Sequence, residues 1–333
     1  MEQNKIFVLL SAHLIVPKAS SNVLTLGKEN KNFVICFAFL SLIRTFAPLL
    51  LNDCLSAFNE FIMRRFFAIL IFVALYITIP TVAQTVEGTV AHPLHVVILG
   101  DSNTWIGGDD CDKPKGWNKW FVDEFRPLSC KSYARSGATW TNTSTTRENV
   151  VEDIAVLGND NVIYNQIARL KRACDEGRQP TPDLIIIAAG TNDAWFVKQR
   201  PKVFAKTAAQ AFADKKPIRG RKPNEVLSLA ESVRYGCELL MERFPEAQII
   251  LLTPLQAIQP TKANLDRASD IIEQCGRRMG LEVVRQDREC CVRRADEQKK
   301  KRYTTDGAHT SEEGARLNGT YLAKRISELL HQH

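Results

Sequence analysis

The sequence predicts an α/β fold: a three-layer α/β/α sandwich with a five-stranded parallel, flavodoxin-like sheet. Two observations lead to this prediction. After residue 84, apolar runs alternate with segments of helical spacing, and short polar motifs follow the ends of four of the expected strands. Strands that alternate with helices form a parallel sheet covered on both faces, and short right-handed connections favour a doubly wound order.

The expected strands are short, and most are rich in Val, Ile and Leu, as strands buried on both faces are. The second one is expected to be a short edge strand. In chain order the five are Leu94–Leu99, Lys131–Ala134, Asp183–Ala189, Ala247–Thr253 and Leu281–Val284.

Helical spacing predicts the segments between and after these strands. Asn224 is a candidate cap for the longest helix, and Thr310 with Glu313 three residues later fits a capping box for the last one. We expect residues 84–333 to form one domain. The expected helices are Trp117–Phe125, Val162–Ala173, Asn224–Phe244, Lys262–Met279 and the segment that follows Thr310.

Residues 63–83 have the three-part layout of a secretory signal peptide. Arg64 and Arg65 precede the apolar stretch Phe66–Ile79, and small residues lie just before Gln84. The apolar stretch is shorter than the roughly 20 residues that a membrane-spanning helix needs. We therefore expect cleavage near Ala83 and export to the periplasm or the extracellular space, with an uncleaved membrane anchor as the alternative.

Residues 1–62 do not fit this layout, because a signal peptide begins a chain. We expect that translation starts at Met63 and that residues 1–62 are not part of the natural mature protein. The alternative is a membrane-embedded N-terminus, since the apolar stretches Ile6–Val16 and Phe33–Leu51 lie in this segment.

Charge and cysteine content exclude several classes of protein. The net charge is +7, but the residues after 83 carry 37 basic and 33 acidic side chains, which does not indicate a nucleic-acid partner. The same part of the chain has seven cysteines and no Cys-x-x-Cys pair, so a zinc ribbon or a thioredoxin-like site has no support. An exported location permits disulfides, but the sequence does not reveal their pairing.

Four polar motifs follow the expected strands. They are Gly-Asp-Ser-Asn at 100–103, Ser-Gly-Ala-Thr at 136–139, Gly-Thr-Asn-Asp at 190–193 and Asp-Gly-Ala-His at 306–309. The carboxyl ends of parallel strands meet at one edge of the sheet, where ligands bind in open α/β folds. The four motifs therefore predict a single site, and the chemistry that their residues suit is acyl transfer.

Ser102 is the candidate nucleophile, although Asp, Ser and Asn at this position are also preferred helix caps. A serine hydroxyl needs an adjacent base. His309 is the candidate by elimination, because the other histidines after residue 84 lie at the amino end of the first strand or in the C-terminal tail. Asp306, three residues before His309, is placed to orient the imidazole.

The oxyanion of a tetrahedral intermediate needs fixed hydrogen-bond donors. Gly137 allows a close approach of the backbone, and Asn192 offers a side-chain amide. A turn glycine and a helix cap are equally good explanations of these two residues when each is taken alone. Their occurrence in order, each after a strand, favours the functional interpretation.

The four motifs resemble those of the SGNH/GDSL hydrolases, a family of lipases, acylhydrolases and esterases, from Leu94 to Leu330. Ser102, Gly137, Asn192 and His309 each stand in one of the family's four blocks. The resemblance implies Ser102 as nucleophile, His309 as base and Asp306 as its orienting acid. It also implies an oxyanion hole formed by the N–H groups of Ser102 and Gly137 and the Asn192 amide, and no cofactor or metal.

Other functions fit the residues less well. The Gly-x-Ser-x-Gly elbow of the α/β-hydrolases is absent. A phosphate site would suit the loop at 100–103, but Asp101 disfavours an anion, and Asp306 and His309 would have no role. A metal hydrolase lacks ligands, since only one histidine is well placed. A catalytically silent carbohydrate-binding descendant remains an alternative.

The expected reaction is hydrolysis of short-acyl esters, acetyl above all, of carbohydrates, and a lipolytic acylhydrolase or thioesterase is the alternative. We expect the irregular stretches Thr139–Asn161 and Ala194–Pro223 to determine substrate specificity. Asp101, Trp140 and Trp195 are candidate substrate contacts, with core packing as the other interpretation of the tryptophans. The basic run Arg293–Arg302 could bind acidic glycans or phospholipid headgroups. The alternative is that it forms a solvated loop.

Overall fold

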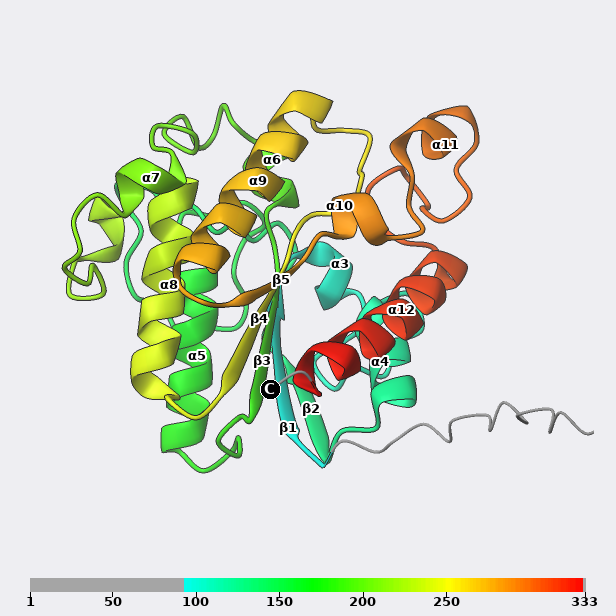
Figure 1. The fold of residues 1–333 in the computed structure, drawn as a ribbon, viewed down its shortest axis with the longest axis horizontal. Coiled ribbons are helices and arrows are strands. Elements are labelled where there is room, and N and C mark those ends of the chain that lie inside the picture. The colour runs from blue at the N-terminus through cyan, green and yellow to red at the C-terminus, as the bar shows by residue number, and fades with distance from the viewer. Residues whose placement is uncertain (1–92, 332–333) are drawn as a thin grey trace, which may run out of the picture. The chain divides into compact units, whose positions relative to one another are not determined.

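The sheet has five parallel strands in the order β2-β1-β3-β4-β5 (Figure 1). This is the flavodoxin-like order, so the fold that the sequence predicts is confirmed. The computed structural model describes residues 93–331. The expected signal peptide at 63–83 and the segment 1–62 lie outside the described residues.

The strand bounds differ from the expected ones by at most two residues, and β2 is at the edge, as expected. The largest shift is at β2, which begins two residues early because it pairs from His95 of β1 onward. The strands are β1 (His95–Gly100), β2 (Ser129–Ser132), β3 (Leu184–Ala188), β4 (Gln248–Leu252) and β5 (Glu282–Val284).

Alternate residues of the central strands pack into two cores, one on each face of the sheet. Val97, Ile185 and Leu251 face the helices α5 (Ile163–Asp175), α8 (Leu229–Arg243) and α9 (Lys262–Arg278). Their sequence neighbours Val96, Ile186 and Ile250 face α4 (Trp117–Phe125) and α12 (Glu312–Leu330). Figure 1 shows the two groups of helices on opposite sides of the sheet. Burial on both faces explains why these strands are apolar throughout.

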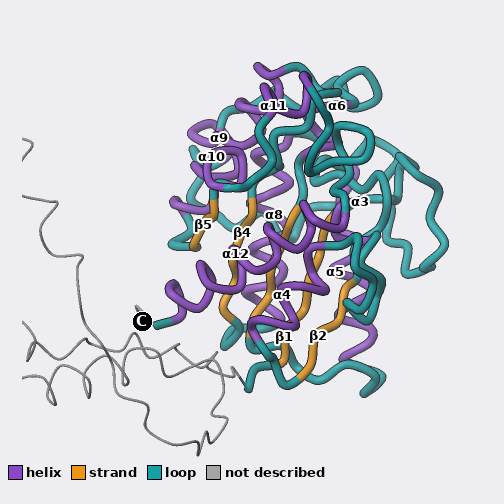
Figure 2. The backbone as a smooth tube through the Cα atoms, turned by 90° about the vertical axis from the view of Figure 1, so that its right-hand side faces the viewer, coloured by secondary structure: helices purple, strands orange, loops and turns teal. Residues whose placement is uncertain are grey.

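Helices α4 and α12 lie side by side on their face of the sheet (Figure 2). Gly319 of α12 allows this close approach. A Cβ atom at this position would lie 2.9 Å from the backbone nitrogen of Phe121 in α4. The last helix of the chain is thereby held against the helix that follows the first strand, and the loop before α12 is fixed near the end of β1.

Two predicted helix caps are wrong. Helix α8 begins after Ser228, whose side chain accepts the N–H of Glu231, and Asn224 lies in a separate 3-10 helix, η1 (Pro223–Glu225). Helix α12 begins after Ser311 rather than Thr310, because the Thr310 hydroxyl donates to the carbonyl of Lys115 instead. In both cases the actual cap is a serine three residues before the backbone N–H that it accepts.

Short helices lie at or beyond the carboxyl edge of the sheet. Helix α3 follows β1, α6 follows β3 and α10 follows β5. The stretch Ala194–Pro223, expected to be irregular, contains one of these helices, α7. The short helices are α3 (Ser102–Trp105), α6 (Thr191–Trp195), α7 (Ala208–Ala211), α10 (Gln286–Glu289) and α11 (Arg294–Lys299).

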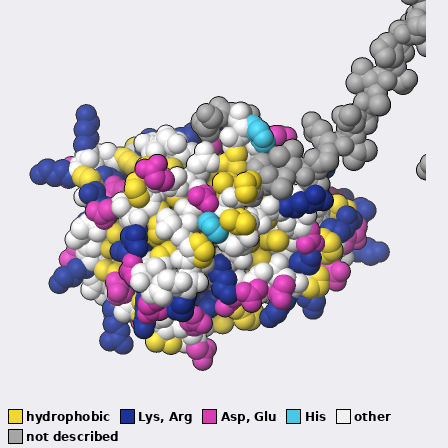
Figure 3. All heavy atoms as spheres, turned by 90° about the horizontal axis from the view of Figure 1, so that it is seen from below, with side chains coloured by type: hydrophobic (Ala, Val, Ile, Leu, Met, Phe, Trp, Pro, Cys, Tyr) yellow, Lys and Arg dark blue, Asp and Glu magenta, His cyan; other side chains and the backbone are white. Residues whose placement is uncertain are grey.

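The face of the molecule at the amino ends of the strands lies opposite the carboxyl edge of the sheet. It carries Lys, Arg, Asp and Glu side chains interspersed with one another (Figure 3). They form no continuous patch of one sign in this view. In the part of the chain from residue 93 to 331, no helix is long and apolar enough to cross a membrane.

Candidate active site

Ser102 lies at the carboxyl end of β1, as the first residue of α3. The turn into this helix is capped by Asp101, whose carboxylate accepts the backbone N–H of Asn103 at 3.1 Å. The capping role weighed for this motif therefore belongs to Asp101. The Ser102 side chain is left to point out of the turn, and the residue is 8% exposed.

Ser102, His309 and Asp306 form one hydrogen-bonded chain. The Ser102 hydroxyl lies 2.9 Å from Nε2 of His309, and Nδ1 of His309 lies 2.7 Å from Oδ2 of Asp306. With its proton on Nδ1, the imidazole donates to Asp306 and accepts the Ser102 hydroxyl at Nε2. The three residues that sequence reasoning assigned to one site are thus brought together.

The Asp306 carboxylate is held by its own loop. Its Oδ1 accepts the backbone N–H groups of Ala308 and His309, both at 2.8 Å. Partial burial raises the pKa of this carboxyl, but the hydrogen bonds from the backbone and ring of His309 and from Ala308 outweigh it and hold the pKa below its usual value. Asp306 is therefore ionised beside the imidazole at neutral pH.

The loop that carries Asp306 and His309 is shaped by residues on both sides of it. Gly307 has φ +93°, and a Cβ there would collide with the side chain of Ile258. The buried carboxylate of Glu297 in α11 accepts the N–H groups of Tyr303 at 2.9 Å and Thr304 at 3.1 Å, which fixes the approach to the loop. Glu297 was not found from the sequence, where it lies within a charged run.

Asn103 joins α3 to the same loop. Its Nδ2 donates to the carbonyl of Ala308 at 3.0 Å, and its Oδ1 accepts the N–H of Thr310 at 3.1 Å. These two bonds flank His309 along the chain, so Asn103 sets the position of the imidazole relative to Ser102. Sequence reasoning treated Asn103 only as part of the first motif.

The second and third motifs are also joined. Asn192 in α6 is buried, and its Nδ2 donates to the carbonyl of Ala138 at 2.9 Å. Its neighbour Asp193 accepts the N–H groups of Trp140 at 3.0 Å and Thr141 at 2.9 Å. The end of β3 thereby holds the loop that follows β2.

Gly137 has φ +76°, the left-handed region that favours glycine. A Cβ at this position would also lie 2.6 Å from Cγ1 of Val156 and 2.9 Å from the backbone nitrogen of Leu157. Glycine is therefore required here both by the backbone conformation and by the close approach of the segment around Leu157.

Asp101 and Trp140 are both buried, which does not favour their assignment as candidate substrate contacts. Asp101 is 3% exposed because its carboxylate turns inward to cap α3. The Trp140 ring is buried in the core between α5 and α8, where it lies against Gly236. Trp195 is half-buried and stacks on Phe196, with ring centroids 4.9 Å apart, so its assignment stays a prediction.

Burial has a strong effect on Asp101. Loss of solvent raises the pKa of its carboxyl to about 6, against the lowering effect of its hydrogen bonds from Asn103 and Thr191 and of His309 nearby.

Within residues 93–331, no group of three or more His, Cys, Asp or Glu side chains is arranged to hold a metal ion.

Comparison with known proteins assigns the chain to a family. The model of the GDSL-like lipase/acylhydrolase family matches residues 98–317. No curated protein matches the chain. Similar solved structures include a lipase/acylhydrolase from Enterococcus faecalis (16% identity, TM-score 0.41, covering 70% of this chain and 96% of that one).

Two further solved structures have comparable similarity. One is the acetyl xylan esterase AlAXEase (13% identity, TM-score 0.43, 70% of this chain and 98% of that one). The other is a member of the lipolytic protein G-D-S-L family from Veillonella parvula (14%, 0.41, 69% and 96%). Because the family model covers most of the chain and all four motifs, the protein is an ester-bond hydrolase that belongs to the GDSL-like lipase/acylhydrolase family.

Proposed function

We propose that this protein is a serine esterase in which Ser102, His309 and Asp306 form the catalytic triad. The observation that supports this most strongly is the unbroken chain of hydrogen bonds from the Ser102 hydroxyl through the imidazole to the Asp306 carboxylate. This arrangement lets one histidine serve first as base and then as acid, while the carboxylate stabilises the imidazolium between these steps.

The reaction takes place in two stages. His309 Nε2 accepts the Ser102 proton as Oγ attacks the ester carbonyl carbon, and the imidazolium then gives that proton to the leaving alcohol as the ester bond breaks. An acyl group remains on Ser102. Water, deprotonated by His309, attacks this acyl-enzyme and releases the carboxylic acid, and the proton returns to Ser102.

The negative charge that develops on the carbonyl oxygen needs donors fixed before the reaction begins. We assign this role to the N–H groups of Ser102 and Gly137 and to the Asn192 amide. One hydrogen of the Asn192 amide bonds to Ala138, which orients the group, and the same nitrogen has a second hydrogen. The conformation of Gly137 and the buried anchor of Asp193 keep the loop after β2 in place.

We propose short-acyl esters of carbohydrates as the substrate class. A pocket of about 230 Å³ lies between the stretches 142–159 and 199–227, and its lining includes several hydroxyl and amide side chains. Such groups suit the hydroxyls of a sugar better than an acyl chain. They include those of Thr143, Ser144, Thr145, Asn159 and Gln199.

We also propose that the mature enzyme is exported after cleavage near Ala83. The support is the layout of residues 63–83 in the sequence. N-terminal sequencing of the native protein tests this proposal. A mature chain that begins near Gln84 is expected, and one that retains Asn30 would contradict both the cleavage and the start at Met63.

The test of function compares hydrolysis of p-nitrophenyl acetate and p-nitrophenyl octanoate by the wild-type chain and by Ser102→Ala. We expect hydrolysis of acetate over octanoate, lost in the variant with no change in melting temperature. Ser269→Ala is the matched control, because it removes a buried hydroxyl of α9 that has no hydrogen-bond partner among residues 93–331. Retained turnover in Ser102→Ala would remove Ser102 from the mechanism, and a preference for octanoate would redirect the substrate to lipids.

A chemical test is independent of the substrate. A fluorophosphonate reacts much faster with an activated serine than with an ordinary one, so it should label the peptide that contains Ser102. Labelling of another serine would contradict the triad, while labelling of Ser102 without ester turnover would preserve the triad and point to a narrow substrate.

A further inference from the structure

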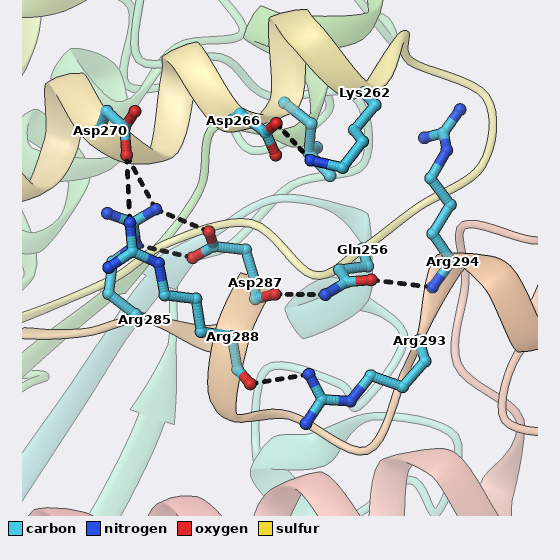
Figure 4. Close-up of a pocket in the computed structure, with 10 residues that line it drawn as sticks. Gln256, Lys262, Asp266, Asp270, Arg285, Asp287, Arg288, Arg293 and Arg294 are labelled. Carbon is cyan, nitrogen blue, oxygen red and sulfur yellow. Dashed lines mark hydrogen bonds and ion pairs between the residues drawn. The ribbon is translucent and has the colours of Figure 1, made fainter.

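A second pocket lies between α9 and the segments that follow β4 and β5. Its volume is about 460 Å³. Figure 4 shows cationic side chains around its rim and carboxylates on the side formed by α9. We call it the basic pocket and define it by Lys262, Asp266, Asp270, Arg288, Arg293 and Arg294.

The positive charge of this pocket is not fully neutralised by the protein. Arg285, in its wall, is compensated by three carboxylates: Asp270, Glu273 and Asp287. Arg293 and Arg294 instead donate to backbone carbonyls: Arg293 to Arg288, and Arg294 to the segment 257–260. No carboxylate among residues 93–331 pairs with either of these two guanidinium groups.

The remaining cations form exposed pairs that a ligand can replace. Lys262 pairs with Asp266 at 2.5 Å, and Arg288 lies 3.6 Å from Asp270. Exposed pairs of this kind contribute little to stability. Exchanging one of them for a ligand carboxylate therefore costs little free energy, and in the case of Lys262 it releases Asp266 to accept a hydroxyl group.

We propose that the basic pocket binds the carboxylate of a uronic-acid unit, so that the substrate glycan is acidic. This inference rests on the proposed esterase function. Guanidinium groups bind carboxylates through paired hydrogen bonds, and Asp266 and Asp270 are acceptors for the hydroxyls of the same sugar. A neutral sugar would supply no negative charge to neutralise Arg293 and Arg294.

The lining excludes a membrane surface as the partner. Leu265 is the one apolar side chain among the residues that line the pocket, and it is 1% exposed. A surface that inserts into a bilayer presents exposed apolar groups beside its basic ones. The concave shape and polar lining fit a soluble ligand the size of a sugar unit.

The pocket and the catalytic loop lie on two sides of one segment, residues 256–260. On the pocket side, Arg294 donates to the carbonyls of Pro260 at 2.8 Å and Ile258 at 2.9 Å. On the other side, the N–H of Ile258 donates to the carbonyl of Gly307 at 2.8 Å. Gln259 Nε2 donates to the carbonyl of Asp306 at 2.5 Å. An acidic unit in the pocket would therefore lie close to an ester held at Ser102.

Binding tests the pocket without any need for turnover. Calorimetry with full-length Ser102→Ala compares a trisaccharide of galacturonic acid with neutral xylotriose. We expect the acidic trisaccharide to bind and the neutral one to bind at least tenfold more weakly. The double variant Lys262→Gln/Arg293→Gln should weaken binding of the acidic trisaccharide by roughly tenfold, as expected for loss of charge-assisted hydrogen bonds.

Lys300→Gln is the matched control, because Lys300 is exposed in the same basic run and does not line the pocket. It should leave binding unchanged. Equal binding of the two trisaccharides, an equal effect of Lys300→Gln, or binding of inorganic phosphate but not of the acidic trisaccharide would each overturn the proposal.

Kinetics separates this proposal from the proposed function. On acetylated polygalacturonate, Lys262→Gln/Arg293→Gln should raise KM with kcat nearly unchanged, whereas p-nitrophenyl acetate turnover should not change. If the wild type binds the acidic trisaccharide but hydrolyses no ester, the esterase function fails while the binding site stands. If it hydrolyses esters and the variant treats acidic and neutral glycans alike, the pocket assignment fails.

Discussion

Asn103 Oδ1 accepts the backbone N–H of Thr310 at 3.1 Å, across 207 residues of sequence. The same side chain donates to the carbonyl of Ala308 at 3.0 Å. Helix α3, which begins with Ser102, is thereby fastened to the loop on both sides of His309. The 2.9 Å separation between the serine hydroxyl and the imidazole depends on this fastening as well as on the two residues themselves.

Replacing Asn103 should therefore impair catalysis although its side chain does not take part in the reaction. In Asn103→Ala both bonds are lost, and buried N–H and C=O groups of the loop lose their partners. We expect kcat for p-nitrophenyl acetate to fall by roughly tenfold or more, since each such bond contributes about 1 kcal/mol. Steady-state kinetics measures the change in kcat, and a melting curve measures the change in stability.

Asn103→Asp separates positioning from general loss of stability. An ionised Asp still accepts from Thr310 but cannot donate to Ala308, so its kcat should fall between those of the wild type and the Ala variant. A rate of fluorophosphonate labelling at Ser102 that follows the same order supports the positioning role. Unchanged labelling in both variants would show that Asn103 acts on stability alone.

Asn192→Ala tests the oxyanion hole. If the amide donates to the developing oxyanion, kcat should fall by roughly 10²–10³ with little change in KM, because the bond is formed only in the transition state. Asn192 also anchors Ala138, so the melting temperature of this variant should fall as well. An unchanged kcat would assign Asn192 to the loop rather than to the reaction.

The features that sequence could predict are those that depend on local pattern. Trp117–Phe125 is a helix with the expected bounds, because its apolar residues recur at helical spacing. The order of the strands follows from their alternation with helices. Ser228 and Glu231 carry the Ser-x-x-Glu pattern of a capping box, a local signal that identifies the true start of α8.

The features that sequence could not predict depend on contacts between distant segments. Asn103 and Glu297 look like ordinary polar residues until the loop at 302–310 folds against them. Trp140 follows the second motif directly, and only the packing of α5 and α8 shows that its ring points into the core. Nothing local distinguishes a tryptophan at the rim of a site from one beneath it.

Asp101 should make the stability of the protein depend on pH in an unusual direction. Burial raises the pKa of this carboxyl from 3.8 to about 6, so between these values the folded state binds a proton that the unfolded state has lost. The contribution of Asp101 to stability therefore falls as pH rises from about 4 to about 6. A shift of this size corresponds to about 3 kcal/mol.

Asp101→Asn should remove this contribution while keeping an oxygen that can cap α3. Denaturant unfolding at pH 4 and pH 7 gives the free energy of unfolding of the variant and of the wild type. Relative to the wild type, the variant should be more stable at pH 7 than at pH 4. Asp153→Asn, at an exposed position, is the control and should follow the wild type. If Asp101→Asn also follows the wild type at both pH values, the carboxyl is not perturbed by burial.

The final prediction concerns the thiols of Cys111 and Cys130. Their sulfur atoms lie 3.5 Å apart, between the loop after α3 and β2. The Cys111 thiol and burial together raise the pKa of Cys130, so the pair does not react readily as thiolate at neutral pH. In an oxidising compartment we nevertheless expect these two cysteines to pair, because their sulfur atoms already lie close together.

Oxidation with glutathione disulfide at mildly alkaline pH should join the two sulfurs, with both thiol hydrogens leaving on two molecules of glutathione. Closing a loop across 19 positions should stabilise the protein by roughly 3 kcal/mol. Peptide mapping should then find Cys111 linked to Cys130, and Cys130→Ser should lose the gain in stability while Cys174→Ser keeps it. If both cysteines are still alkylated after oxidation, the loop after α3 is held by its hydrogen bonds and ion pairs alone, without a covalent link.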